Sequence, residues 1–382
     1  MKLERFRRCG LFMAIVGAAL SAGCKPPPEK LAIDPTKGYI DAKVVLLQSA
    51  EDKDGAVCSH ALEALAGTLG AEAGATFLQA LESENPAVRF AAALAIGDVK
   101  YKPALQALQK MAQPKGERDK RAFCAVVFAL YKLGNDQHAN ELGTLLFDKD
   151  REVRMNAAMA MGRMGEPSAI GPLKTILANE QDDGVRIQVT ESLAMLGDTR
   201  SAEVIEAYTK GYFLDLRLAA IPALGRVGSS RAPRVLKQLI RPRNPARVRV
   251  SAAGELARLG HPDSEAYALC AASVKDPEKV LREASKKSKM AADRDAASLK
   301  RLAILSLGLM NRDVAVNLLH PLLKSRDGGV RVAAAFSVLR LLEAYRPIAP
   351  EPKAPATRPA AKSGKPEPAV KKPKLHTAGG KD

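Results

Sequence analysis

Residues 153–165 read VRMNAAMAMGRMG, and the same frame recurs along most of the chain. A hydrophobic residue and an arginine open the frame, alanines and other small residues fill it, and one or two glycines close it. From Arg154 to Arg249 it returns every 31 or 32 residues, which predicts an array of repeated units and not a single globular core. Copies led by arginine begin at Val88, Val153, Val185, Leu216, Val248 and Val330.

Within one copy the apolar residues are spaced as on one face of a helix. The stripe consists of Val153, Ala157, Ala160, Met161 and Met164. A second apolar stripe follows the glycine-containing turn, over residues 170–177. Each unit is therefore predicted to be a helical hairpin, and such hairpins must stack because one alone cannot bury its apolar face.

The residues before each frame indicate where its first helix begins. Asp150 is an expected N-cap, because its carboxylate can accept hydrogen bonds from the free N–H groups of the first turn. The pairs Asn85-Pro86 and Asn244-Pro245 are interpreted as a capping amide followed by a proline in the first helical turn.

Degenerate copies extend the array, beginning at Cys58, Ala122 and Leu299. We predict an all-α protein, a right-handed α-solenoid of about eight helix-turn-helix units over residues 39–345. Helix layers about 8 to 10 Å apart would give a quasi-linear row about 60 to 80 Å long with one concave face.

The pattern Val-Arg-x-x-Ala-Ala-x-Ala-Leu-Gly-x-x-Gly, with an Asp or Asn shortly before it, resembles the short HEAT-like repeats named after phycobilisome lyases. The resemblance covers residues 55–342 and implies the α-solenoid fold. Proteins with such repeats include bilin lyases, iron-dependent hydroxylases and scaffolds, so the resemblance does not imply one activity.

Catalytic motifs are missing from the sequence. The iron enzymes with this repeat use His-Glu pairs, and none of the five histidines here is followed by Glu. Cys58 and His60 are two residues apart and are expected on different faces of a helix. Nucleophile-elbow and phosphate-binding glycine motifs are also missing. We therefore predict a protein that is not an enzyme, with no cofactor, no metal and no bilin lyase role; the alternative is a lyase-like or metal-dependent enzyme, or enzyme subunit, with its active site on the concave face.

The first residues of the chain are typical of an export signal. A basic start precedes the apolar run Leu11–Leu20, which is too short to favour a membrane-spanning helix. The ending Ser-Ala-Gly-Cys resembles the bacterial lipobox, although that family usually has Leu in place of Ser21. We predict a signal peptide over residues 1–23, lipidation of Cys24 and a linker over residues 24–38; ordinary cleavage near Gly23 is the alternative.

Two stretches depart from the repeat. Residues 275–297 form a charged insertion, interpreted as a longer helix or solvated loop or, alternatively, as a docking element. Residues 346–382 are rich in Pro, Ala and Lys, with nine basic residues against three acids, and are predicted to be disordered. This tail either contacts anionic lipid or wall polymers or stays solvated.

Arginines that recur at one position of the repeat are the candidate site residues. One hypothesis is a structural ladder in which they pair with the capping acids just before them, such as Asp150 and Asp327; the other is a basic ladder for an anionic partner. The structural ladder is the favoured hypothesis. The six residues are Arg89, Arg154, Arg186, Arg217, Arg249 and Arg331.

The amino-acid composition limits the classes of molecule that the protein is expected to bind. Aromatic residues make up only 4% of the chain and Trp is absent, so stacking of bases and binding of nucleic acid are not expected. Cys58, Cys124 and Cys270 lie in apolar helical patterns and are expected to be buried free thiols. We predict a lipoprotein of the bacterial outer membrane that binds a further protein of the cell envelope as a scaffold.

Overall fold

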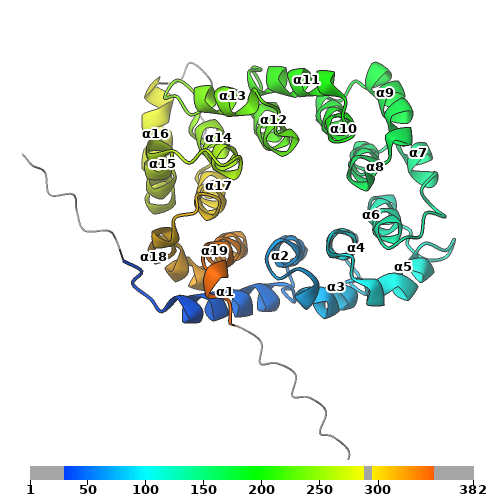
Figure 1. The fold of residues 1–382 in the computed structure, drawn as a ribbon, viewed down its shortest axis with the longest axis horizontal. Helices are drawn as coiled ribbons and strands as arrows, with labels where there is room; N and C mark the ends of the chain where they lie inside the picture. The colour runs from blue at the N-terminus through cyan, green and yellow to red at the C-terminus, as the bar shows by residue number, and fades with distance from the viewer. Residues whose placement is uncertain (1–29, 288–294, 348–382) are drawn as a thin grey trace, which may run out of the picture. The chain divides into compact units, whose positions relative to one another are not determined.

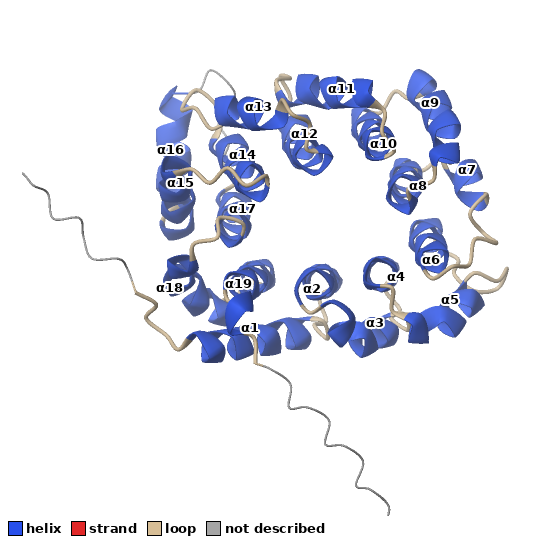
Figure 2. Ribbon diagram, in the orientation of Figure 1, coloured by secondary structure: helices blue, strands red, loops and turns tan. Residues whose placement is uncertain are grey.

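The structure is a computed structural model, and it describes residues 30–287 and 295–347. Within these ranges the regular elements are helices, arranged as an inner and an outer layer (Figures 1 and 2). The inner helices are α2 (Gly55–Thr68), α4 (Pro86–Val99), α6 (Lys120–Lys132), α8 (Arg151–Met164), α10 (Asp183–Met195), α12 (Leu214–Val227), α14 (Ala246–Arg258), α17 (Ala296–Gly308) and α19 (Gly328–Leu341). The outer helices are α1 (Pro35–Ser49), α3 (Gly74–Ala80), α5 (Leu105–Met111), α7 (Glu141–Leu145), α9 (Ile170–Asn179), α11 (Thr199–Thr209), α13 (Ala232–Leu239), α15 (Ser264–Lys275), α16 (Pro277–Lys287) and α18 (Val316–Leu319).

The sequence prediction of an all-α solenoid is confirmed, and the solenoid is closed. Each inner helix packs against the next, and α19 packs against both α1 and α2 (Figure 1). Across the closure Arg331 Nη2 donates to Asp52 Oδ2 at 3.0 Å, and Asn317 Nδ2 donates to the Lys30 carbonyl at 2.9 Å. The expected quasi-linear row with free ends is therefore not formed, and the inner layer of the described residues holds nine helices instead of about eight.

The capping predictions hold for two of three helices. Asp150 accepts from the Glu152 N–H at 2.9 Å, and Asn85 caps α4 with a proline in its first turn. The third prediction is wrong: α14 begins at Ala246, and Pro245 precedes it without a side-chain cap. The Asn244 amide oxygen instead accepts from Arg217 Nη2 at 2.7 Å, so it is not available to the helix start.

Small residues let neighbouring inner helices approach closely. A Cβ added at Gly308 of α17 would lie 2.6 Å from the Ser337 Cβ of α19. The Ser337 hydroxyl donates to the Ile304 carbonyl at 3.0 Å, which joins the same two helices. Glycine is needed at this position because any larger side chain would push α17 and α19 apart.

The buried cysteines behave as the sequence predicts. Cys58, Cys124 and Cys270 are free thiols in the core. Burial raises the pKa of both Cys124 and Cys270 to about 12. These thiols are therefore protonated at neutral pH and contribute to packing.

The boundaries of the solenoid and of the charged insertion differ in part from the prediction. Helix α1 begins at Pro35 with Asp34 as its N-cap, four residues before the expected start of the solenoid. The charged insertion contains α16, which packs against α15 and α17 through Val280, Leu281 and Ala284. The signal peptide and Cys24 (residues 1–29), part of the insertion (288–294) and nearly all of the tail (348–382) lie outside the described residues. Within the described ranges, every helix is too short or too polar to cross a membrane.

Candidate functional site

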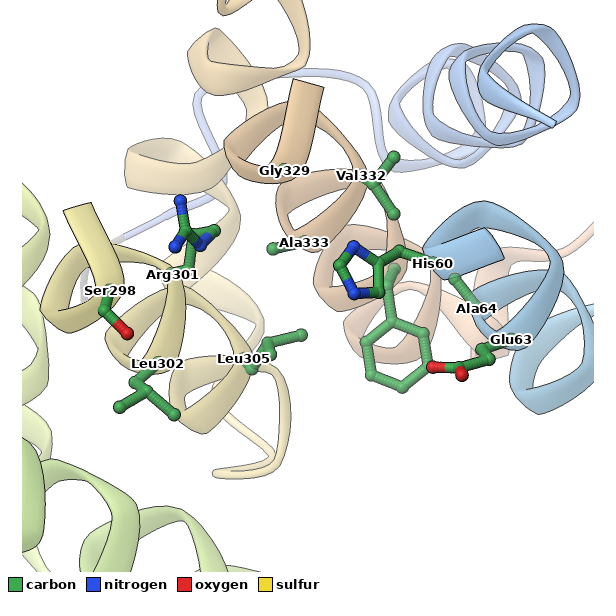
Figure 3. Close-up of a pocket in the computed structure, with 11 residues that line it drawn as sticks. His60, Glu63, Ala64, Ser298, Arg301, Leu302, Leu305, Gly329, Val332 and Ala333 are labelled. Carbon is green, nitrogen blue, oxygen red and sulfur yellow. The ribbon is translucent and has the colours of Figure 1, made fainter. Parts of the chain in front are cut away.

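A pocket of about 350 Å³ lies where the last inner helices meet the first one (Figure 3). Helices α2, α17 and α19 line it, so it exists only because the solenoid closes. Asp98 of α4 and Arg163 of α8 also act electrostatically on Glu63 in this pocket. The lining residues are His60, Glu63, Ala64, Ser298, Arg301, Leu302, Leu305, Gly329, Val332, Ala333 and Phe336.

The polar groups of the pocket come from two helices (Figure 3). His60 and Glu63 are three residues apart on α2, a spacing that puts both side chains on one face. Arg301 comes from α17, and its Nη1 lies 3.8 Å from the Asp327 Oδ2, a long and partly exposed ion pair. Such a pair is weak, so the guanidinium can turn toward an incoming anion.

The rest of the pocket surface is apolar. Leucines from α17 and small and aromatic residues from α19 form most of it. The Leu305 side chain is 36% exposed, although it is large and aliphatic. The Arg340 guanidinium lies 5.7 Å from the centre of the Phe336 ring and covers one side of it. The site is therefore suited to a flat, largely apolar molecule that carries an acidic group.

Glu63 has an unusual protonation equilibrium. The carboxylate is accessible to solvent, yet the protein around it removes part of its hydration, and this desolvation raises its pKa. His60 and Arg163 counteract the shift, whereas Asp98 adds to it. A carboxyl group with a raised pKa takes up a proton more readily than an ordinary carboxylate does, which suits it to proton exchange with a bound molecule.

The sequence-predicted arginines lie elsewhere, at the junctions between outer and inner helices. Arg154 Nη1 donates to the carbonyl oxygens of Asp148 at 2.9 Å and Lys149 at 3.1 Å. Its Nε and Nη2 donate to the two carboxylate oxygens of Glu180, at 2.7 and 3.1 Å. The acid that pairs with Arg154 thus belongs to the following unit, while Asp150 caps the helix.

The other five arginines make related contacts. They donate to Ser83, Glu84 and Glu117 (Arg89), to Leu177, Glu180 and Tyr208 (Arg186), to Thr209 and Asn244 (Arg217), to Ile240 (Arg249), and to Ser325 and Asp52 (Arg331). Burial lowers the pKa of both Arg217 and Arg249. The ladder residues and the pocket are therefore separate features of the described chain.

The pocket residues were not among the candidates from the sequence. The sequence pattern pairs His60 neither with a following Glu nor with Cys58, whose thiol lies 2.9 Å from the Ala50 carbonyl in the core. The pair His60 and Glu63 is a visible signal, but Arg301 is distant in sequence and only ring closure brings it near. No group of three or more His, Cys, Asp or Glu side chains within the described ranges is arranged to hold a metal ion.

The sequence matches a family model described as HEAT repeats over residues 44–123 and 115–194. Residues 44–194 of the chain therefore consist of HEAT repeats. Two curated relatives of this HEAT-repeat protein were found. A bilin biosynthesis protein of Synechococcus sp. is 29% identical over 123 residues, which cover 31% of this chain and 41% of the relative. The alpha subunit of a phycocyanobilin lyase of Picosynechococcus sp. is 30% identical over 139 residues, which cover 31% and 52%.

The HEAT-repeat protein spans about half, or less, of the length of these two relatives. A solved phycocyanin lyase complex of Nostoc sp. aligns with a TM-score of 0.33 and 19% identity over 70% of this chain and 94% of the other. The relatives overturn the prediction that the protein is not an enzyme, because one is named as a lyase subunit and the other as a bilin biosynthesis protein. An enzymatic role need not leave a local motif in a helical repeat, because catalytic groups that come from different repeats are distant in sequence.

Proposed function

We propose that this HEAT-repeat protein is a subunit of a lyase-like enzyme and binds an acidic, conjugated molecule of the linear tetrapyrrole class. The observation that carries the proposal is the pocket at the closure, which combines a guanidinium, an imidazole and a carboxyl group with an apolar surface. The names of the two relatives support the ligand class. The protein partner expected in the cell envelope is then the second component of the enzyme.

Each part of the pocket has a role in this proposal. Arg301 pairs with a propionate of the ligand, because a guanidinium binds a carboxylate with two parallel hydrogen bonds. The surface around Phe336 and Leu305 contacts the pyrrole rings. His60 and Glu63 hold and move protons at the nitrogen or carbonyl groups of the rings. A volume of about 350 Å³ fits part of such a molecule, so the remainder extends out of the pocket.

Biliverdin, a linear tetrapyrrole, is the probe for this proposal. We expect the purified chain to bind it, with a shift in its visible absorption and an induced circular dichroism. Arg301→Gln is expected to weaken binding about 10- to 100-fold, since it removes a charge-assisted hydrogen bond worth about 1.5–3 kcal/mol. Arg282→Gln is the matched control, because Arg282 forms an equally weak ion pair with Glu278 at 3.7 Å, on α16.

Two results would overturn the proposal. The first is a chain that folds normally and does not bind biliverdin at micromolar concentrations. The second is equal affinity for biliverdin in the Arg301→Gln and Arg282→Gln variants, which would place the ligand outside this pocket.

We also propose that the protein is anchored to the envelope through Cys24. The sequence before Cys24 supports this, because a basic start, a short apolar run and small residues are typical of a lipoprotein signal. Cys24→Ser is expected to move the protein from the membrane fraction to the soluble fraction of bacterial cells. Cys9→Ser is the control and leaves the protein in the membrane fraction. Unchanged membrane association of Cys24→Ser would contradict the anchor.

A further inference from the structure

The stretch from residue 216 to residue 254 contains nine Lys or Arg residues and no Asp or Glu. It covers most of α12, all of α13 and most of α14. In other units of the array many bases pair with acids, such as Arg89 with Glu117 and Arg154 with Glu180. This excess of basic residues has a cost, because like charges without acidic partners repel one another and destabilise the fold.

The structure accounts for five of these cations. Arg217 and Arg249 donate to backbone carbonyls in the interior, at 2.8 and 2.9 Å. Ion pairs involve Arg226 with Glu191, Arg231 with Glu203 and Glu206, and Arg247 with Asp295.

Four cations remain, and all four are exposed. They form no ion pair or hydrogen bond within the part of the chain that the structure describes, although Arg234 lies within electrostatic reach of Glu206. They are Arg234, Lys237, Arg241 and Arg243. A cluster of this kind attracts a polyanion.

These cations surround two hollows on the surface of α13. Arg234, Lys237 and Arg241 line the first, and Arg243 lines the second. Gln238 lines both, so the two hollows adjoin each other. The imidazole of His261 also lines the first hollow and adds a further nitrogen that can form hydrogen bonds. Each hollow offers donors from several directions, as an anionic headgroup requires.

An exposed aromatic pair lies next to the second hollow. Tyr212 is 77% exposed and Phe213 is 66% exposed, and both belong to the short loop between α11 and α12. Their rings contact each other edge to face, with centroids 5.8 Å apart. Lys210 and Arg217, which line the second hollow, flank this loop in the sequence. Two adjacent aromatic rings this exposed cost hydration free energy unless they enter an apolar medium.

We propose that this surface, made of the α11–α12 loop and the exposed face of α13, docks onto an anionic phospholipid bilayer. Tyr212 and Phe213 enter the headgroup region, where aromatic rings are favoured. Lys237, Arg241 and Arg243 bind lipid phosphates, and each cation near an anionic membrane strengthens binding about fivefold. A bilayer fits better than an acidic protein groove, because Tyr212 and Phe213 are largely exposed. In addition, Lys237, Arg241 and Arg243 form no ion pair within the described residues.

Phe213→Trp provides a direct probe, because the chain contains no tryptophan. In the full chain with Cys24→Ser, which removes any lipid anchor, we expect its emission to shift to the blue with vesicles of phosphatidylcholine and phosphatidylglycerol. Vesicles of phosphatidylcholine alone are expected to leave the emission unchanged. Phe147→Trp is the matched control: Phe147 is 55% exposed, far from this loop in sequence, and its emission should not shift.

Charge reversal tests the cations. Lys237→Glu with Arg241→Glu is expected to weaken binding to the anionic vesicles by more than about 10-fold, whereas Arg282→Glu with Lys286→Glu on α16 retains it. The proposal is overturned if both pairs of substitutions act equally, since binding would then reflect net charge, or if residue 213 reports no insertion. Binding of soluble polyglutamate at this surface without any binding of vesicles would assign it to an acidic protein instead.

Discussion

Replacing Arg154 by alanine is expected to lower the free energy of unfolding by about 3–5 kcal/mol. The Glu180 carboxylate is buried, and both of its oxygens accept hydrogen bonds from Arg154. Without the guanidinium, a carboxylate that joins two units of the array is left in the interior without its counter-charge. Urea unfolding followed by circular dichroism at 222 nm measures the loss.

The effect of Arg154→Ala should decrease in acid. Burial alone would raise the Glu180 pKa, but hydrogen bonds from Arg154 and from the backbone N–H groups of Asp182 and Gln181 hold it below its usual 4.5. A carboxyl group with a lowered pKa stabilises the folded state above pH 4.5 and loses this contribution as the pH falls through the folded-state value. The difference between the variant and the wild type should therefore shrink below pH 4.5.

Two variants separate the ion pair from other effects of the substitution. Arg151→Ala removes an exposed arginine of the same helix, whose side chain is 59% exposed, and should cost less than about 1 kcal/mol. Arg154→Met combined with Glu180→Leu should restore most of the stability, because an apolar pair needs no counter-charge. Equal losses for Arg151→Ala and Arg154→Ala would show that the buried contact does not support the fold.

Leu342→Asp is expected to open the ring at its closure. Leu342 is fully buried, and a Cβ added at Gly38 of α1 would lie 3.0 Å from its Cδ1, so it packs where α19 meets α1. A carboxylate there costs several kcal/mol, because it is desolvated without a partner. Amide hydrogen exchange in α1 and α19 should rise by more than about 100-fold, while exchange in α10 stays unchanged.

Val204→Asp is the control for this experiment, because Val204 lies on α11 with 39% of its surface exposed. It should leave exchange unchanged throughout the chain. If Leu342→Asp instead raised exchange uniformly, the ring would unfold as one cooperative unit, and the independent opening of the closure would be refuted. Biliverdin binding should be lost together with the closure, because the pocket draws on α2, α17 and α19.

Only part of the pocket has a signal in the sequence. His60 and Glu63 share a helix face, which a search at a spacing of three residues finds. The contribution of Arg301 to the pocket could not be predicted from the sequence, because it depends on contacts between helices at opposite ends of the array. The ladder arginines were visible since they recur with the repeat, but their acid partners were assigned to the wrong residues. Asp150 caps its own helix, and Glu180 of the next unit pairs with Arg154.

The sequence by itself determined the helical hairpins, their period and most of their starts. These features depend on interactions within a few residues, such as the cap at Asp150 and the apolar stripe from Val153 to Met164. Only the tertiary structure decided that the array closes and that a pocket forms where it does. The curvature of a solenoid is the sum of small rotations from one unit to the next, and each rotation is set by side-chain packing that no local pattern encodes.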